Sequence, residues 1–180
     1  MHLARADVSE PLVIRHTTNR GVGAAIASGY AQALKDGADL VAVLAGDGQM
    51  DAAELPRLIE PILRQDVDYV KGDRTTHPLV SQRMPYWRRA GNAALSRWTA
   101  MLTGYALNDA QCGFTVIRAP ALRRLPLREL TRGYGYPNTL LLMLAACGAR
   151  VHEVTVTPIY GDERSGLTPL RALRTHGAIM

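Results

Sequence analysis

The feature that most constrains the fold is an apolar run that ends abruptly in an acidic, glycine-containing turn, from Leu40 to Asp51. The apolar half, which includes Val41 and Val43, predicts a buried β-strand. Asp47 and Gln49 follow this strand directly. Because ligands of open α/β sheets bind at the carboxyl ends of the strands, we expect a binding site at this turn.

Three side chains of the turn offer oxygen ligands, namely Asp47, Gln49 and Asp51. Carboxylate and amide oxygens are preferred by Mg²⁺ and Mn²⁺, so the turn is a candidate metal site beside a diphosphate. Asp51 has a second interpretation, because Glu54 follows it at the spacing of a helix capping box. We therefore predict that Asp51 mainly caps a helix and that Asp47 is the functional acid.

The composition favours one domain with a positive charge. The chain has 180 residues, 47% of them hydrophobic, and a net charge of +5, from 21 Lys and Arg against 16 Asp and Glu. Arginine dominates, and Lys35 and Lys71 are the only lysines. Arginine suits bidentate phosphate binding, although a GC-rich genome gives the same bias. Arginines crowd into residues 74–97 and 118–132, which indicates a basic groove for an anionic ligand.

Several classes of protein fit the sequence poorly. Cys112 and Cys147 lie far apart, and the five histidines show no metal-binding spacing, so neither a zinc site nor a disulfide-built fold is expected. No run approaches the roughly 18 apolar residues of a membrane span, which predicts a soluble or peripheral protein. Few aromatic residues interleave with the arginines, so nucleic-acid binding is not expected.

Strand and helix patterns alternate along the chain. This order predicts an α/β fold with an open, mostly parallel sheet flanked by helices. Asn19, Gly21 and Gly23 open the first helix, where a GxG turn is a weak phosphate signal and is equally a packing feature. The predicted strands are 12–16, 40–44, 67–72, 115–118 and 151–157, and the predicted helices are 19–37, 52–64, 85–102 and 138–147.

The helix predicted over residues 85–102 carries both arginines and tryptophans. Arg88 and Arg89 either clamp an anionic acceptor or form a solvated face. Trp87 and Trp98 either touch a membrane interface, where amphipathic rings and cations are both stable, or fill the core. Both pairs of interpretations stay open.

A second polar turn spans residues 108–114 and leads into the strand at 115–118. Asp109 within it lies beside the sheet, where a general base is useful, or it is an ordinary turn residue. A further polar loop, at 158–166, is rich in groups that bind phosphate or hydroxyl.

Five segments, in their order and spacing, resemble the inverting family 2 glycosyltransferases of GT-A fold, and the nearest branch is the polyprenyl-phosphate (dolichol-phosphate-type) sugar transferases. The similarity runs from about residue 12 to 168. The segments are Asn19-Arg-Gly-Val-Gly-Ala, Gly46-Asp-Gly-Gln-Met-Asp51, Tyr69-Val-Lys-Gly-Asp-Arg74, Asp109-Ala-Gln-Cys-Gly-Phe114 and Tyr160-Gly-Asp-Glu-Arg-Ser-Gly166.

The resemblance implies transfer of a sugar from a UDP- or GDP-sugar to a polyprenyl phosphate or similar acceptor. It places the protein at the cytoplasmic face of the membrane as a peripheral protein, and implies Mg²⁺ or Mn²⁺ as cofactor. Asp109 is implied as the base or the acceptor-orienting residue. The other implied site residues are Asp47 and Gln49 for the metal, Asn19, Gly21, Gly23, Arg164 and Ser165 for the donor diphosphate, and Arg74, Arg88 and Arg89 for the acceptor phosphate.

Two departures from the family pattern affect this interpretation. Ala45 stands where the family commonly has the first acid of its DxD pair. The strands that open the family's domain and bind the nucleotide base are expected to precede residue 1, so residues 1–168 are expected to be a partial GT-A domain, with 169–180 as a basic tail. The alternative function is a non-catalytic subunit that binds a partner, or a second copy, through an open sheet edge.

Overall fold

The fold is an α/β arrangement in a computed structural model that describes residues 11–159. The four strands are β1 (Leu40–Val43), β2 (Tyr69–Asp73), β3 (Thr115–Arg118) and β4 (Val151–Thr155). The longer helices are α1 (Val22–Lys35), α2 (Leu55–Arg64), α4 (Tyr86–Thr103) and α6 (Tyr136–Ala146), and the shorter ones are η1 (Ala52–Glu54), α3 (Val80–Arg83), α5 (Ala119–Arg123) and η2 (Leu127–Glu129).

The four strands form one mixed sheet in the order β1-β3-β2-β4. β1, β2 and β4 run in the same direction, as a mostly parallel sheet requires, while β3 pairs antiparallel with both β1 and β2. The predicted parallel arrangement does not extend to β3, which lies between β1 and β2 and is antiparallel to both. Only β2 and β4 pair in parallel, with Lys71 opposite Glu153.

The strand predicted over residues 12–16 does not form. This segment is extended but belongs to no strand, and Leu12, Val13 and Ile14 are 68%, 64% and 45% exposed. A strand needs a partner for its main-chain groups, and β1, the edge strand on this side, pairs only with β3 among the described residues. The apolar pattern alone therefore gave a wrong prediction here.

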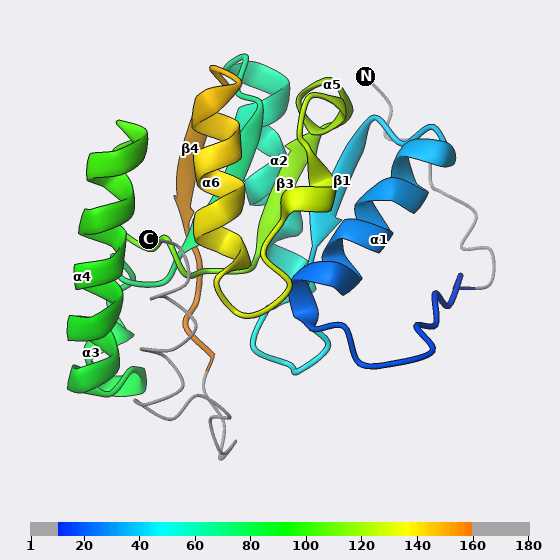
Figure 1. The fold of residues 1–180 in the computed structure, drawn as a ribbon. Coiled ribbons are helices and arrows are strands. Elements are labelled where there is room, and N and C mark those ends of the chain that lie inside the picture. The colour runs from blue at the N-terminus through cyan, green and yellow to red at the C-terminus, as the bar shows by residue number, and fades with distance from the viewer. Residues whose placement is uncertain (1–10, 160–180) are drawn as a thin grey trace.

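Helices cover both faces of the sheet, as Figure 1 shows, with α1 and α6 in front and α2 behind. The front layer contains Tyr30 of α1 and Leu141 of α6, and the layer behind contains Leu58 and Ile62 of α2. Small and straight-chain residues in α1 favour the helical conformation and let it lie close to the sheet. Asp51 caps the short helix that leads into α2, since its Oδ1 accepts a hydrogen bond from Ala53 N at 2.8 Å; the predicted cap is confirmed.

Helix α4 is amphipathic in the reverse sense, with its polar face turned inward. It stands beside α6 at the edge of the molecule (Figure 1), and its buried side chains are Asn92, Ser96 and Thr99. Trp98 is 56% exposed and Met101 is 78% exposed. Trp87 is exposed too, so the interpretation of the two tryptophans as core residues is wrong.

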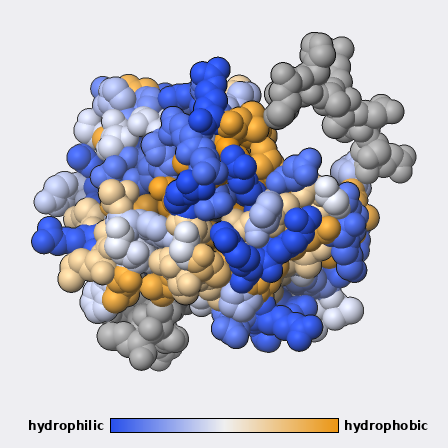
Figure 2. Space-filling view, turned by 90° about the horizontal axis from the view of Figure 1, so that it is seen from above, coloured by the Kyte–Doolittle hydropathy of each residue, from blue (hydrophilic) through white to orange (hydrophobic). Residues whose placement is uncertain are grey.

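One edge of the sheet gathers the polar turns. The carboxyl ends of β1, β2 and β4, the start of β3, and the first residues of α1 and α6 meet at the lower edge in Figure 1. Figure 2 looks down on the opposite end of the molecule, where hydrophilic side chains gather over the middle of the face. Asn19, Asp47, Gln49, Arg74 and Asp109 thus lie at the edge where ligands of open α/β sheets bind.

Candidate active site

The turn after β1 is held by short-range hydrogen bonds. Asp47 Oδ1 accepts a hydrogen bond from Gln49 N at 3.0 Å, and Ala45 N contacts Met50 Sδ at 3.2 Å. Gly48 adopts φ +74°, in the left-handed region that favours glycine. The Asp47 side chain is exposed at the tip of this turn, so its carboxylate is accessible to a ligand.

The oxygen atoms of this turn suit a divalent cation in their chemistry. Asp47 supplies a carboxylate and Gln49 an amide, and a hard cation such as Mg²⁺ commonly takes one or two protein oxygens and completes its shell with phosphate and water. Within residues 11–159, no three His, Cys, Asp or Glu side chains are grouped so that they could hold a metal by themselves. A metal at Asp47 and Gln49 would therefore share its coordination with a phosphorylated ligand.

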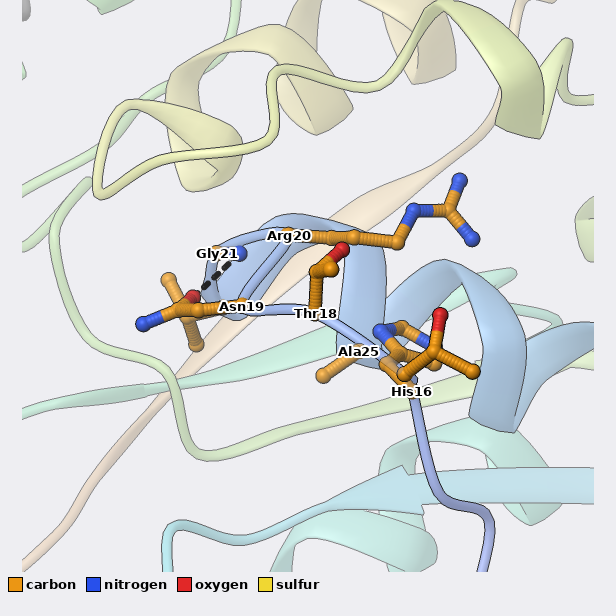
Figure 3. A pocket seen from close by; sticks show the side chains of 8 residues that line it. His16, Thr18, Asn19, Arg20, Gly21 and Ala25 are labelled. Atoms are coloured by element: carbon orange, nitrogen blue, oxygen red, sulfur yellow. Dashed lines mark hydrogen bonds between the residues drawn. The ribbon is translucent and has the colours of Figure 1, made fainter.

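The loop before α1 lines a hollow of about 420 Å³ that is widely open to solvent. Figure 3 shows Asn19 turned toward the backbone, where its Oδ1 accepts from Gly21 N at 2.9 Å, while the Arg20 side chain extends away from that turn. Gly23 N donates to the Arg132 carbonyl oxygen at 2.8 Å, and a Cβ on Gly23 would overlap the Thr131 carbonyl oxygen. Packing against residues 131–132 thus accounts for a glycine at position 23.

Arg74 and Asp109 form a two-pronged ion pair across the site. Arg74 Nε lies 2.7 Å from Asp109 Oδ2, and Arg74 Nη2 lies 3.0 Å from Oδ1. Asp109 is fully buried, whereas the Arg74 side chain remains 21% exposed. The pair joins the end of β2 to the turn at 108–114, which are 35 residues apart in sequence.

Buried charges around this pair alter its protonation. Burial alone would raise the pKa of Asp109, but the Arg74 guanidinium, the Lys71 charge and the hydrogen bond from Asn92 outweigh it and lower the pKa to about 2. Lys71 is itself buried and donates to the Asp109 carbonyl oxygen. Because its pKa is lowered, the Asp109 carboxylate is ionised at neutral pH.

Glu153 shows the opposite shift. Burial raises its pKa, against the opposing hydrogen bonds from the backbone N–H groups of Asn108 and Asp109.

A small, largely enclosed cavity of about 20 Å³, room for roughly one water molecule, lies between the turn after β1 and Arg74. Its lining includes Gln49, Met50, Arg74, Cys112 and Phe114. Burial raises the pKa of the Cys112 thiol, which keeps it protonated. The structure thus brings two predicted groups, the oxygen-bearing turn and the arginine, to one pocket.

The other predicted acceptor residues lie on α4. Arg88 and Arg89 are half-buried near the start of this helix, and the Arg88 guanidinium lies 5.3 Å from the centre of the Trp87 ring. Neither residue lines the pocket that contains Arg74. Arg164, Ser165 and the tail 169–180 lie outside the described residues.

Sequence reasoning did not single out three residues of this site, namely Lys71, Asn92 and Glu153. Lys71 directly follows Tyr69 and Val70 in a strand whose residues are all buried, and Asn92 is the first of three polar residues at helical spacing on α4. Both are patterns that the sequence contains. The backbone hydrogen bonds that Glu153 accepts from Asn108 and Asp109 cross 45 and 44 residues, so no local pattern indicates them.

An open α/β sheet whose polar turns gather at the carboxyl ends of its strands defines a class of α/β proteins that bind their ligands at that edge. The sequence model of glycosyl transferase family 2 matches residues 6–125. The chain belongs to this family. The family prediction is therefore confirmed.

Curated relatives include sugar transferases of lipid phosphates. The chain is 30% identical over 151 residues to a UDP-N-acetylglucosamine–dolichyl-phosphate N-acetylglucosaminyltransferase of Methanococcus voltae, covering 84% of this chain and 60% of that protein. It is 30% identical over 146 residues to an undecaprenyl-phosphate mannosyltransferase of Micrococcus luteus, covering 81% and 59%. The chain thus spans about three fifths of the length of these relatives.

Solved structures share the fold. A glucosyl-3-phosphoglycerate synthase from Mycobacterium tuberculosis, in complex with Mn²⁺, uridine diphosphate and glucosyl-3-phosphoglycerate, has a TM-score of 0.60 and 19% identity over 93% of this chain and 54% of that one. The same enzyme in complex with Mg²⁺ and uridine diphosphate has a TM-score of 0.59 and 21% identity, and the match again covers 93% of this chain and 54% of that one. The GT-A fold prediction is confirmed, with the mixed sheet described above.

Proposed function

We propose that this chain transfers a sugar from a UDP- or GDP-sugar to a polyprenyl phosphate or a similar anionic acceptor, with inversion at the anomeric carbon. The observation that supports this most is that Gln49 of the oxygen-bearing turn and Arg74, which follow the carboxyl ends of β1 and β2, line the same small cavity. Relatives named for dolichyl phosphate and undecaprenyl phosphate support the same acceptor class.

The proposed reaction is a single displacement. A phosphate oxygen of the acceptor forms a bond to the anomeric carbon, the bond from that carbon to the diphosphate breaks, and the nucleoside diphosphate leaves with the electron pair. A phosphate monoester, with its second pKa near 6, is largely ionised at neutral pH, so this oxygen needs positioning and charge compensation more than deprotonation. Arg74 would supply both.

The donor side would involve a divalent cation. Asp47 and Gln49 would hold Mg²⁺ or Mn²⁺, which when bound neutralises charge on a departing diphosphate. The backbone around Asn19, Gly21 and Gly23, and the side chains of Arg164 and Ser165, are the further proposed donor contacts. Solved structures of this fold in complex with Mn²⁺ or Mg²⁺ and uridine diphosphate support the metal.

Titration calorimetry of the purified chain tests the donor half of this proposal. We expect UDP or GDP to bind in the presence of Mn²⁺, with at least about tenfold weaker binding in Asp47→Asn, because a direct metal ligand is lost. Asp36→Asn, an exposed acid near the end of α1, is the matched control and should bind like the wild type. Absence of binding to either nucleotide would remove the enzymatic role.

The outer face of α4 supports a membrane contact. Its exposed side chains include Trp87, Trp98, Met101 and Leu102, and the sequence has no acidic residue between Asp73 and Asp109. Aromatic rings with cations on one helix face are typical of helices that lie in the interface of an anionic bilayer. Among residues 11–159, no helix has the length and apolar character needed to cross a bilayer.

Sedimentation with vesicles that contain an anionic phospholipid tests this contact, which we place at the cytoplasmic membrane face. Leu102→Ala combined with Trp98→Ala should weaken vesicle binding by at least about tenfold, since burial of such side chains contributes roughly 1.5–3 kcal/mol each. Leu63→Ala, which removes an exposed leucine of α2, is the control. Equal loss in both variants would argue against α4 as the contact.

A binding role remains the second candidate, and the edge strand β1 favours it. On its outer side β1 has no partner strand among the described residues, and exposed strand edges are templates for pairing with another chain. Light scattering after size exclusion would show an obligate dimer or higher oligomer in that case. A monomer that binds nucleotide would contradict it.

A further inference from the structure

The Asp109 carboxylate has its acceptor positions occupied. Oδ2 accepts hydrogen bonds from Arg74 N at 3.1 Å and Arg74 Nε at 2.7 Å, and Oδ1 accepts from Arg74 Nη2 at 3.0 Å and Asn92 Nδ2 at 2.9 Å. A carboxylate offers about four lone-pair sites. Asp109 therefore has two donor residues holding it and a fully buried side chain, which is a poor arrangement for taking a proton from a substrate.

Neighbouring carboxylates are also engaged in holding the fold. Asp73 accepts hydrogen bonds from the backbone and hydroxyl groups of Thr75 and Thr76. Glu54 accepts from Thr157 N and Oγ1, which attaches the end of η1 to the segment after β4. These carboxylates order the loops around the pocket.

The buried side chain of Asn92 makes one hydrogen bond and leaves a second polar atom without a partner among the described residues. Its Nδ2 donates to Asp109, but its Oδ1 is buried without a hydrogen-bond partner in the described part of the chain. A buried polar atom without a partner is destabilising, so an apolar residue would be favoured here if packing alone mattered. The donation to Asp109 is the interaction that accounts for an amide at this position.

We propose that Asp109 and Asn92 are positioning residues that hold the Arg74 guanidinium at the pocket, and that Asp109 does not act as the proton acceptor. This inference rests on the proposed function, since it assigns Arg74 to the acceptor phosphate. The two-pronged pair fixes the plane of the guanidinium, and Asn92 fixes the carboxylate in turn. An arginine oriented before binding loses less conformational entropy when it contacts a phosphate.

Two variants and one matched control test the proposal. Asp109→Asn removes the ion pair while keeping the size of the side chain, and Asn92→Ala removes the second support. Ser96→Ala is the control, because Ser96 lies on the same buried face of α4 and its Oγ accepts a hydrogen bond from Ala110 N rather than contacting the carboxylate. Farnesyl phosphate serves as the acceptor, with a UDP- or GDP-sugar as donor.

A positioning role and a base role give different kinetics. For positioning, Asp109→Asn should raise the KM for farnesyl phosphate by roughly 10–100-fold, because the charge-assisted hydrogen bonds that orient Arg74 are lost. The donor KM and the shape of the pH–rate profile above pH 5 should stay unchanged. Asn92→Ala should act in the same direction by about 3–10-fold, and Ser96→Ala should leave the acceptor KM unchanged. A fall in kcat with an unchanged acceptor KM would overturn the proposal.

Direct binding separates this inference from the proposed function. Calorimetric titration with farnesyl phosphate, and with inorganic phosphate as the headgroup alone, measures the acceptor affinity without transfer. Binding by the wild type that weakens in Asn92→Ala but not in Ser96→Ala supports the positioning role even where no sugar is transferred. Equal affinities in these three proteins, or no binding by the wild type, would overturn it. Asn92→Ala carries the test if Asp109→Asn does not fold.

Discussion

The two sides of the pocket are built differently. On the turn after β1, Asp47 and Asp51 are exposed and their hydrogen bonds reach residues two positions away. On the other side, Lys71 and Asp109 are buried, and the contacts of Asp109 reach Arg74 and Asn92, at 35 and 17 residues' distance. The turn takes its shape from its own sequence, whereas the ion pair depends on the whole fold. We therefore expect substitution of Asp47 to affect ligand binding alone, and substitutions at the ion pair to affect stability as well.

The largest expected difference concerns the free energy of unfolding. Asp109→Ala should lower it by about 3–5 kcal/mol, because removing one partner leaves buried positive charge from Lys71 and Arg74 uncompensated. Asp47→Ala should change it by no more than about 0.5 kcal/mol, as expected for an exposed side chain. Urea denaturation of both variants measures the difference. Similar values for the two would show that the contrast between the two sides is wrong.

The second expected effect is a loss of stability in acid. The pKa of Asp109 in the folded protein, about 2, lies below its usual value of 3.8, so its contribution to stability is present above pH 3.8 and is lost as the pH falls from about 4 to 2. The loss should be about 2 kcal/mol. Glu153, whose pKa is raised by burial, gives a contribution of the opposite sign.

Asp109→Asn isolates the Asp109 contribution to this acid effect. The variant keeps Glu153 and every other carboxylate, so the difference from the wild type between pH 5 and 2 reports the one group. Denaturation midpoints measured across that range should converge as the pH falls. Parallel curves would contradict the link between the ion pair and stability.

The smallest expected effect extends the comparison to the packing at the start of α1. Gly23→Ala should destabilise by at least about 1 kcal/mol, because the new Cβ would overlap the Thr131 carbonyl oxygen. Gly29→Ala, on the same helix with nothing within 4 Å, should stabilise by about 0.5–1 kcal/mol. Thermal unfolding of both variants tests this. Stabilisation by both would mean that position 23 is not closely packed.

The elements that local patterns predict agree well with the structure. The helix predicted over 85–102 is α4, the strand at 115–118 is β3, and the capping role of Asp51 is confirmed. These predictions depend on hydrophobic periodicity and on side chains that bond to nearby backbone, both of which are written into short stretches of sequence.

Pairing and burial were harder to predict, because both depend on residues far apart in the chain. The insertion of β3 between β1 and β2 requires contacts across more than 40 residues, and the segment 12–16 has a strand-like pattern without a strand. The role of Asp109 stays a prediction. Its fourfold hydrogen bonding could not be predicted from the sequence, since Arg74 and Asn92 reach it only in the folded chain.

The inward polar face of α4 has a geometric consequence for the proposed lipid acceptor. Asn92 and Ser96 attach the helix to residues 109 and 110, so the apolar outer face of α4 and the Arg74 guanidinium belong to one rigid unit. They are separated by at least the width of one helix, roughly 10 Å, because Asp109 lies between Arg74 and Asn92 of α4. A protein that rests on a bilayer through α4 would therefore keep Arg74 at a constant height above the acyl chains, and that height would select acceptors by how far their phosphate extends from the lipid.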